Sequence, residues 1–258
     1  MAKTRLDLLL VARGLAPSRS LAQRLVMAGQ VRVDDQLILK PATSVDPSAR
    51  LHIQAGPRFV SRGGEKLEAA LGAFPVTAAG KVCADVGAST GGFTDCLLQH
   101  SAARVYAIDV GQGILDWRMR NHPAVVVMEN TNARNVAHLP EPVSLVTVDA
   151  SFISLKILLP VISEWFEPAG EVIALIKPQF EAGRALVSRG KGVIRDPAVH
   201  TQVVQEVLQA AAALGYGARG LLRSPLVGPK GNVEFLVWLD FPGSAELPAD
   251  IIAQVVLA

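Results

Sequence analysis

The sequence predicts an α/β protein in which helices cover a mostly parallel sheet, preceded by a small basic domain. Three observations predict this. From about residue 81 to 214, strand-like apolar runs alternate with helix-like segments, a pattern typical of a parallel sheet. The first of these runs leads into a glycine-rich turn at 87–92. Up to Val60 there are nine Lys and Arg against four Asp, net +5, whereas the remainder has 16 against 19, net −3. A basic head on a slightly acidic body indicates a polyanion partner for the head.

The length and composition set the outer bounds. With 258 residues, half of them hydrophobic, the chain can bury the cores of one large and one small domain. The first apolar run is too short for a signal peptide, because Asp7 and Arg13 bracket it. No apolar stretch approaches membrane-spanning length. We therefore expect a cytoplasmic monomer with no membrane partner.

The cysteines and histidines give no sign of a metal site. Cys83 lies in the first apolar strand and Cys96 in the helix after the glycine-rich turn. We find no second Cys or His at metal-binding spacing from either of them, and no H-x-x-x-H pattern. We therefore expect two reduced core thiols and no metal. The five histidines receive no chemical role: His52, His100, His122, His138 and His200.

The first 55 residues predict a small α/β domain. Apolar spacing predicts helices over 5–13 and 21–28, the second capped by Ser18 or Ser20, then a hairpin over 31–38 and a strand over 51–53. Its basic side chains can contact phosphates without reading bases; the alternative is that they are merely solvated. The candidates are Arg5, Arg19, Arg24, Arg32 and Lys40.

A linker at 56–60 separates this domain from a larger one over 61–243, because Gly56 and Pro57 break helix and strand. An amphipathic helix is expected to begin at Lys66 and to run through Leu71 and Phe74. If this helix buries its apolar face against the sheet, Lys66 is expected to lie near the opening of a ligand-binding site at the sheet.

Residues 81–95 read as a strand, a small-residue turn and the start of a helix. Glycines let backbone amides approach a ligand, and the helix points its positive end at the same place. The turn fails the G-x-G-x-x-G dinucleotide template. With Asp85 before it and Asp109 ending the next strand, it resembles instead the class I methyltransferase site for S-adenosylmethionine; the alternative is a turn whose glycines serve packing only. The resemblance assigns cofactor contacts to Asp85, Gly87, Ala88, Ser89, Thr90, Gly91, Gly92, Asp109 and, near the adenine, Asn132.

The remaining elements complete the sheet. We expect helices over 94–100, 115–120, 155–166 and 196–214, and strands over 105–109, 125–128, 144–149 and 171–177. A basic loop over 180–195 should lie near the substrate, and strands over 221–226 and 232–239 should form an antiparallel pair. No structure is assigned to the tail over 244–258. Because ligands bind at the carboxyl ends of such strands, Asp85, Asp109, Asp149 and Lys177 should meet there.

Four charged residues at the predicted strand and helix ends favour a joint interpretation: Lys66, Asp149, Lys177 and Glu234. Lysines and carboxylates are costly to desolvate, so they should pair or act. The alternative is that each is an ordinary ion-paired residue. We expect Lys177 to contact the 2′-oxygen of a ribose that accepts a methyl group. Asp149 and Glu234 would position Lys177, and Lys66 would add positive field.

This set matches the K-D-K-E tetrad of FtsJ-like ribose 2′-O-methyltransferases. The pattern from Ser18 to Asp34, S-R-x-x-A-x-x-L-V-x-x-G-x-V-x-V-x, resembles the S4 RNA-binding domain. Together with V-S-R-G-G-E-K-L at 60–67 and I-K-P-Q-F-E at 176–181, these motifs make the chain to about residue 240 similar to the TlyA family.

That resemblance implies a class I (Rossmann-like) seven-stranded sheet and S-adenosylmethionine-dependent methylation of cytidine 2′-hydroxyls in ribosomal RNA or ribosomal subunits. It also carries an older label of haemolysin. Further RNA contacts are expected at Arg62, Arg189 and Lys191. Two alternatives remain open: an RNA-binding protein without chemistry, and a membrane-active haemolysin.

Overall fold

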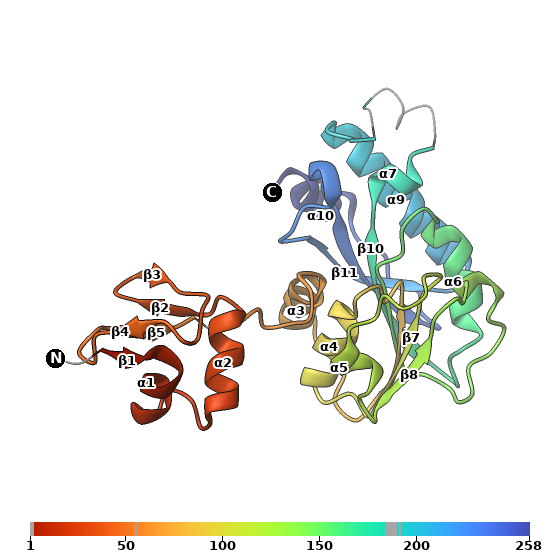
Figure 1. Ribbon diagram of the computed structural model, residues 1–258. Helices are drawn as coiled ribbons and strands as arrows, with labels where there is room; N and C mark the ends of the chain where they lie inside the picture. The colour runs from red at the N-terminus through yellow and green to blue at the C-terminus, as the bar shows by residue number, and fades with distance from the viewer. Residues whose placement is uncertain (1–2, 55, 184–189, 191) are drawn as a thin grey trace. The chain divides into compact units, whose positions relative to one another are not determined.

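The structure is a computed structural model that describes residues 3–54, 56–183, 190 and 192–258. The chain divides into two compact units, Met1–Arg58 and Phe59–Ala258 (Figure 1). The division falls inside the segment that we expected to be a linker. Phe59 already belongs to the core of the larger unit, and the Val60 amide donates to the carboxylate of Asp95 at 2.8 Å.

The smaller unit packs two helices against short strands. Helices α1 (Leu6–Ala12) and α2 (Arg19–Met27) are present, and Ser18 caps α2 by accepting from the Leu21 amide. Strand β2 (Val31–Val33) lies between β3 (Gln36–Leu37) and β5 (Leu51–Ile53). A second pair, β1 (Thr4–Arg5) with β4 (Ser44–Val45), was not predicted, because two residues are too few to show an alternating pattern.

The larger unit contains a seven-stranded sheet, as the sequence predicts. Its order is β11-β12-β10-β9-β6-β7-β8. Strands β6 to β10 are parallel, and β12 runs antiparallel between β10 and β11. The strands are β6 (Val82–Val86), β7 (Arg104–Ile108), β8 (Val125–Met128), β9 (Leu145–Val148), β10 (Gly170–Ile176), β11 (Gly217–Arg223) and β12 (Phe235–Phe241).

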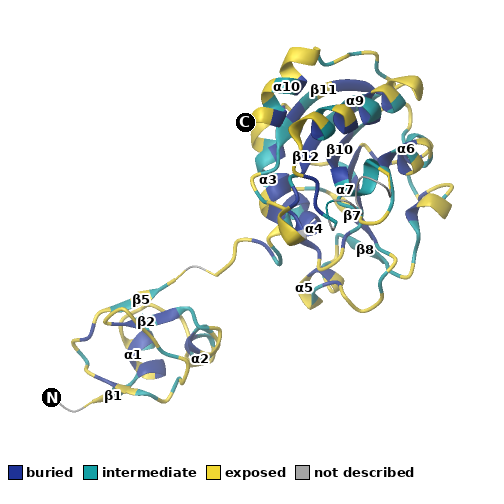
Figure 2. Cartoon of the chain, turned by 90° about the horizontal axis from the view of Figure 1, so that it is seen from above, coloured by how far each residue is buried: buried dark blue, intermediate teal, exposed yellow. Residues whose placement is uncertain are grey.

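Helices cover both faces of this sheet because its strands are apolar on both sides (Figure 2). Along β10, Val172 and Ala174 face one core and Ile173 and Leu175 the other. Helices α3 (Gly63–Ala73) and α4 (Gly92–Gln99) cover one face; α6 (Leu155–Ser163), α9 (Pro197–Ala213) and α10 (Ala249–Leu257) cover the other. The short elements are α5 (Trp117–Arg120), α7 (Pro178–Glu181) and the 3-10 turns η1 (Ala133–Asn135) and η2 (Pro229–Gly231).

Several element boundaries differ from our expectations; β12, for example, lies over 235–241 rather than 232–239. Helix α3 begins at Gly63 rather than Lys66. No side chain of the described residues caps it, so the sequence carries no start signal there. Strand β11 lies over 217–223 rather than 221–226, because Pro225 cannot donate to a ladder. The tail, to which we assigned no structure, contains α10, and Ile252 and Val256 of α10 are buried in the core.

The membrane alternative requires a segment that can enter a bilayer. Among the residues that the structure describes, every helix is too short or too polar to cross one.

Candidate active site

The glycine-rich turn joins β6 to α4. Gly87 adopts φ +83°, and a Cβ atom there would lie 2.8 Å from the backbone oxygen of Asp149. Only glycine tolerates both the left-handed conformation and that approach. Gly91, at φ +95°, is the N-cap residue of α4. The turn is therefore packed directly against the end of β9, where Asp149 follows the strand.

Asp85 lies beneath the turn and is fully buried. Its carboxylate accepts from Thr94 Oγ1 at 2.7 Å and from Thr147 Oγ1 at 3.3 Å. Burial raises the pKa of Asp85 to about 7, and the two threonine hydroxyls oppose that rise. Asp85 is not on the wall of the cavity described below, so in this structure it supports the turn from within the core.

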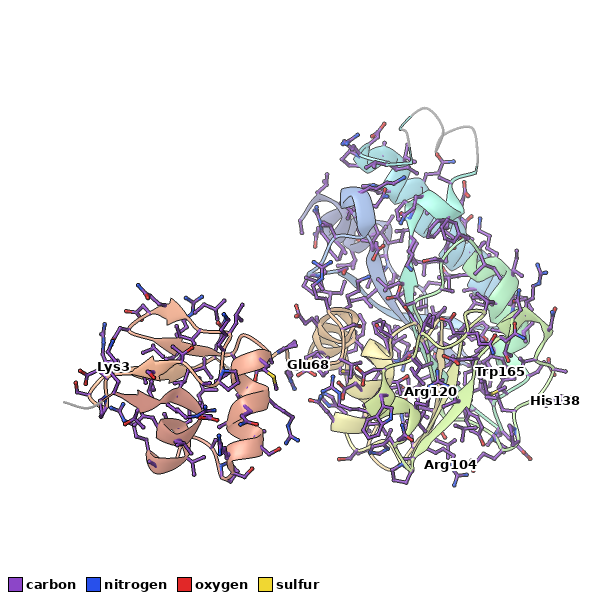
Figure 3. The ribbon with its side chains drawn as sticks, viewed as in Figure 1. Lys3, Glu68, Arg104, Arg120, His138 and Trp165 are labelled. Atoms are coloured by element: carbon purple, nitrogen blue, oxygen red, sulfur yellow. The ribbon has the colours of Figure 1, made fainter. Side chains whose placement is uncertain are left out.

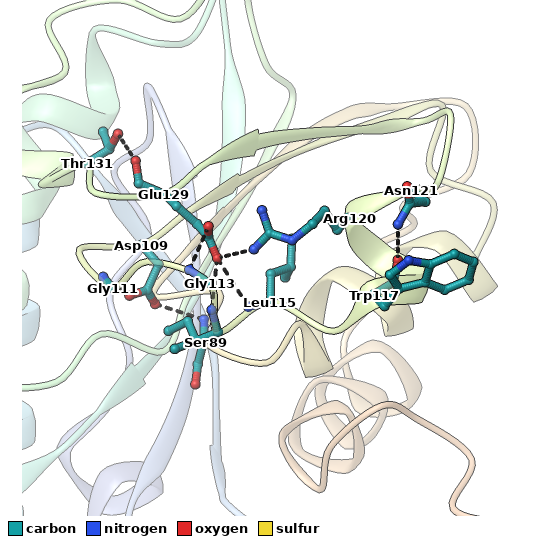
Figure 4. A network of polar contacts seen from close by, with 11 residues as sticks. Ser89, Asp109, Gly111, Gly113, Leu115, Trp117, Arg120, Asn121, Glu129 and Thr131 are labelled. Atoms are coloured by element: carbon teal, nitrogen blue, oxygen red, sulfur yellow. Dashed lines mark hydrogen bonds and ion pairs between the residues drawn. The ribbon is translucent and has the colours of Figure 1, made fainter.

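Asp109 and Glu129 organise the loop after β7 (Figure 4). Asp109 accepts from the amides of Ser89 (2.8 Å) and Gly111 (2.7 Å). Glu129 accepts from Arg120 and from three loop amides, and the Arg120 guanidinium holds the pKa of Glu129 at about 2. Asn132 caps η1 by accepting from the Arg134 amide. Neither Asp109 nor Asn132 lines the cavity, and their cofactor contacts stay predictions.

A cavity of about 1020 Å³ opens beside the turn. Five of the nine residues that we expected to bind the cofactor line it: Gly87, Ala88, Ser89, Thr90 and Gly92. So do all four residues of the predicted tetrad, together with Arg62. The glycine turn and the tetrad thus face one space, although they come from segments far apart in the sequence.

The tetrad forms a connected cluster around Asp149. Asp149 Oδ1 lies 2.5 Å from Lys177 Nζ, and Oδ2 lies 3.6 Å from Lys66 Nζ. Lys66 Nζ also donates to Glu234 Oε2 at 2.7 Å. Lys177 Nζ makes further contacts at 3.2 Å with the Asp149 backbone oxygen and with Ser151 Oγ. Two ammonium groups and two carboxylates therefore compensate each other in a largely buried site.

One of the expected pairings is wrong. We expected Glu234 to position Lys177, but the carboxylate of Glu234 is paired with Lys66. Glu234 precedes β12 and Lys177 follows β10; these strands pair antiparallel with Ile176 opposite Phe235. The pairing of these strands places Glu234 close to Lys177 in the sheet, but Lys66 of α3 forms the ion pair with the Glu234 carboxylate. Lys66 is correspondingly buried, with 9% of its surface exposed.

The sequence did not identify several cavity residues. Phe152 is 90% exposed, adopts φ +64° and lies 4.9 Å, ring centre to ring centre, from Phe180. A bulky residue in the left-handed region is strained, and no pattern in the sequence predicts this conformation. Gln179 Oε1 is buried and, among the described residues, has no hydrogen-bond partner. Phe180 and Gly192 belong to the loop over 180–195 that we expected near the substrate, of which residues 184–189 and 191 lie outside the described residues. The other unexpected lining residues are Ser61, Gly63, Phe93, Ser151, Leu226, Val227, Gly228, Lys230 and Asn232.

The expected RNA contacts fall into four groups. Arg5 and Arg19 both donate to Asp7, a fully buried carboxylate of α1. Arg32 donates to the Asp35 backbone oxygen at 2.9 Å. Arg24, Lys40 and Arg62 are exposed. Arg189 and Lys191 lie outside the described residues.

The seven-stranded sheet, with a glycine turn and a cavity at the carboxyl ends of its central strands, defines a class I methyltransferase fold. Residues 59–241 match the FtsJ-like methyltransferase family and residues 4–51 match the S4 domain. The chain therefore belongs to the FtsJ-like methyltransferase family, and S-adenosylmethionine is the cofactor of this class.

Similar proteins confirm the resemblance to the TlyA family. The 16S/23S rRNA (cytidine-2′-O)-methyltransferase TlyA of Mycobacterium tuberculosis is 46% identical over 92% of this chain and 90% of that protein. Hemolysin A of Brachyspira hyodysenteriae is 38% identical over 90% of this chain and 98% of that protein. A solved structure from Streptococcus thermophilus, described as a candidate hemolysin, is 39% identical with a TM-score of 0.76, over 100% of this chain and 95% of that one.

Proposed function

We propose that this protein transfers a methyl group from S-adenosylmethionine to the ribose 2′-hydroxyl of cytidine in ribosomal RNA, and that it acts in the cytoplasm. The observation that carries the proposal is the cluster of Lys66, Asp149, Lys177 and Glu234 on the wall of the cavity that the glycine turn also lines. The identity of the nucleoside comes from the relative named as a cytidine 2′-O-methyltransferase.

The cavity fits the cofactor in size and chemistry. Its volume of about 1020 Å³ is at the upper end of ligand pockets, which typically span about 300–1,000 Å³. The segment from Gly87 to Thr90 would hold the cofactor through its backbone. The unsatisfied acceptor of Gln179 in the wall is typical of a site built for a ligand with donor groups. When bound, S-adenosylmethionine supplies an electrophilic methyl group attached to a sulfonium sulfur.

The tetrad activates the acceptor oxygen. A ribose hydroxyl is a poor nucleophile until its lone pair is oriented and its proton is drawn away. Lys177 Nζ is held in place by Asp149 and Ser151, so it can orient the oxygen with little loss of side-chain entropy. Lys66, fixed by Glu234 and Asp149, adds positive field that stabilises the developing oxyanion.

The exposed ring of Phe152 offers a surface on which the target base can stack. It lines the cavity close to Ser151 and packs against Phe180. Stacking on an aromatic side chain is worth about 1–3 kcal/mol per base. This ring would hold the nucleotide while its ribose faces Lys177.

The S4 unit binds the RNA substrate. Arg5 and Arg19 extend from a buried Asp7 to the surface, and Arg24 and Lys40 are exposed. A guanidinium group that is held on one side by the Asp7 carboxylate still has N–H groups that can donate to phosphate oxygens.

Mapping of 2′-O-methyl positions in ribosomal RNA from cells with and without this gene tests the function. We expect at least one methylated cytidine to disappear, and to reappear with the wild-type gene but not with Lys177→Met. Lys81→Met is the matched control, because Lys81 pairs with Glu171 at the amino ends of β6 and β10, whereas the tetrad lies at the carboxyl ends. Unchanged methylation maps would refute the assignment.

Two alternative functions predict other results. An RNA-binding protein without chemistry would show no S-adenosylmethionine binding by isothermal titration and no dependence on Lys177. A membrane-active haemolysin would release dye from clean liposomes at submicromolar concentration, which we do not expect.

A further inference from the structure

Cys96 and His100 lie four residues apart, at the end of α4 and its C-cap. We expected neither cysteine to stand at metal-binding spacing from a histidine, and that expectation overlooked this pair. Side chains four residues apart meet on one face of a helix. Glu68 lies on the neighbouring helix α3, where Figure 3 labels it. Its carboxylate contacts both of these side chains.

The three side chains converge closely. Glu68 Oε2 lies 2.7 Å from His100 Nε2 and 3.7 Å from Cys96 Sγ, and all three ligand atoms lie within 4.8 Å of one another. Ligand atoms around a tetrahedral zinc ion, at about 2.0–2.3 Å from the metal, lie roughly 3.3–3.7 Å apart. Shifts of less than about 1 Å in the two partly exposed side chains would therefore create a metal site.

The donor set selects the ion. A thiolate, an imidazole and a carboxylate together suit Zn²⁺, whereas Mg²⁺ and Ca²⁺ prefer oxygen ligands only. The Cys96 side chain is fully buried, while the Glu68 and His100 side chains are 29% and 35% exposed. An ion can enter from that exposed side, and water can occupy its fourth position.

We propose that Glu68, Cys96 and His100 bind one Zn²⁺ ion and join α3 to α4. Binding releases the thiol proton and any proton shared by His100 and Glu68. None of the three residues lines the cavity. The two helices nevertheless position the reaction site: α3 carries Lys66, and α4 begins at Gly92 in the glycine turn. The ion would thus fix the spacing of Lys66 from that turn without touching substrate.

Titration of the full-length, tag-free, metal-free protein with Co²⁺ tests the proposal. We expect one Co²⁺ per chain, an intense thiolate-to-cobalt absorption band and displacement of Co²⁺ by Zn²⁺. Cys96→Ser should abolish the band. His100→Gln should weaken binding at least about tenfold, the lower end of the effect of losing an outer-shell partner. Cys83→Ser is the matched control, because Cys83 is equally buried but outside the cluster.

Thermal melts give a second readout that does not depend on cobalt. Zn²⁺ should raise the melting temperature of the wild type and of Cys83→Ser, and should raise that of Cys96→Ser and His100→Gln by less. The His100 variant keeps the test valid if Cys96→Ser fails to fold. Absence of a thiolate band in the wild type, or a band that survives Cys96→Ser, would overturn the proposal.

Discussion

In each unit of this protein one carboxylate holds two cationic side chains, but the surroundings differ. In the S4 unit, Asp7 accepts from Arg5 and Arg19 at 2.9–3.0 Å; the carboxylate is fully buried, while the arginine side chains are 40% and 53% exposed. In the methyltransferase unit, Asp149 contacts Lys66 and Lys177, whose side chains are only 11% and 7% exposed.

This difference indicates two uses of the same charge arrangement. A guanidinium bound along one edge keeps donors that face water, so it can grip a phosphate. The Arg5 guanidinium holds the pKa of Asp7 far below its usual range, which keeps the anchor charged. A buried ammonium is a compact charge in a site of low dielectric constant, where it acts strongly on one nearby oxygen. The first arrangement suits binding and the second suits catalysis.

The largest effect is expected from Asp149→Asn, because Asp149 touches both lysines. The rate of methyl transfer in single-turnover assays should fall at least about 1,000-fold, within the range for loss of positioned acid–base groups. S-adenosylmethionine affinity by isothermal titration should change little. A fall of less than tenfold would show that Asp149 does not organise the cluster.

Glu234→Gln should have a smaller effect, because among the described residues Glu234 pairs with Lys66 alone, and Asp149 remains in contact with both lysines. We expect the single-turnover rate to fall about 10- to 100-fold. A loss as large as that of Asp149→Asn would mean that Glu234 acts on Lys177 after all.

Asp85→Asn tests the buried support of the glycine turn through pH. Burial raises the pKa of Asp85 from 3.8 to about 7, so between these values the folded protein holds a proton that the unfolded chain has released. The stability that this proton contributes is complete below about pH 4 and is lost as the pH rises through about 7.

Urea unfolding at about pH 5 and about pH 8 measures this loss. The wild type should lose on the order of 2 kcal/mol more unfolding free energy over this range than Asp85→Asn. Parallel pH dependence of the two proteins would contradict the assignment of this proton to Asp85.

The smallest effect concerns the S4 unit. Arg19→Gln should weaken binding to ribosomal RNA several-fold and reduce the slope of log affinity against log salt by about one. Filter binding at several salt concentrations measures both. Arg50→Gln is the control, since Arg50 is exposed but paired with the exposed Asp35. Equal losses in both variants would show that anchoring by Asp7 is irrelevant.

The sequence predicted the sheet and the tetrad because the carboxyl ends of parallel strands lie on the same side of a sheet. Once the strands are located, Asp149 and Lys177 are therefore expected to lie close together. Pairings across elements were not predictable in this way. The pairing of Lys66 with Glu234 depends on how deeply α3 packs, and the strained backbone of Phe152 depends on the loop after β9. The convergence of Glu68 with Cys96 and His100 likewise requires two packed helices, although the spacing of Cys96 and His100 was readable.

The central claim is that Lys177 acts on the ribose oxygen and not on cofactor binding. It is tested by measuring, for Lys177→Met and the control Lys81→Met, the single-turnover rate of methyl transfer to ribosomal RNA together with the S-adenosylmethionine dissociation constant. We predict a rate at least about 1,000-fold below wild type for Lys177→Met, with dissociation constants and the Lys81→Met rate near those of the wild type. A Lys177→Met protein that methylates RNA at a rate near that of the wild type would contradict the claim.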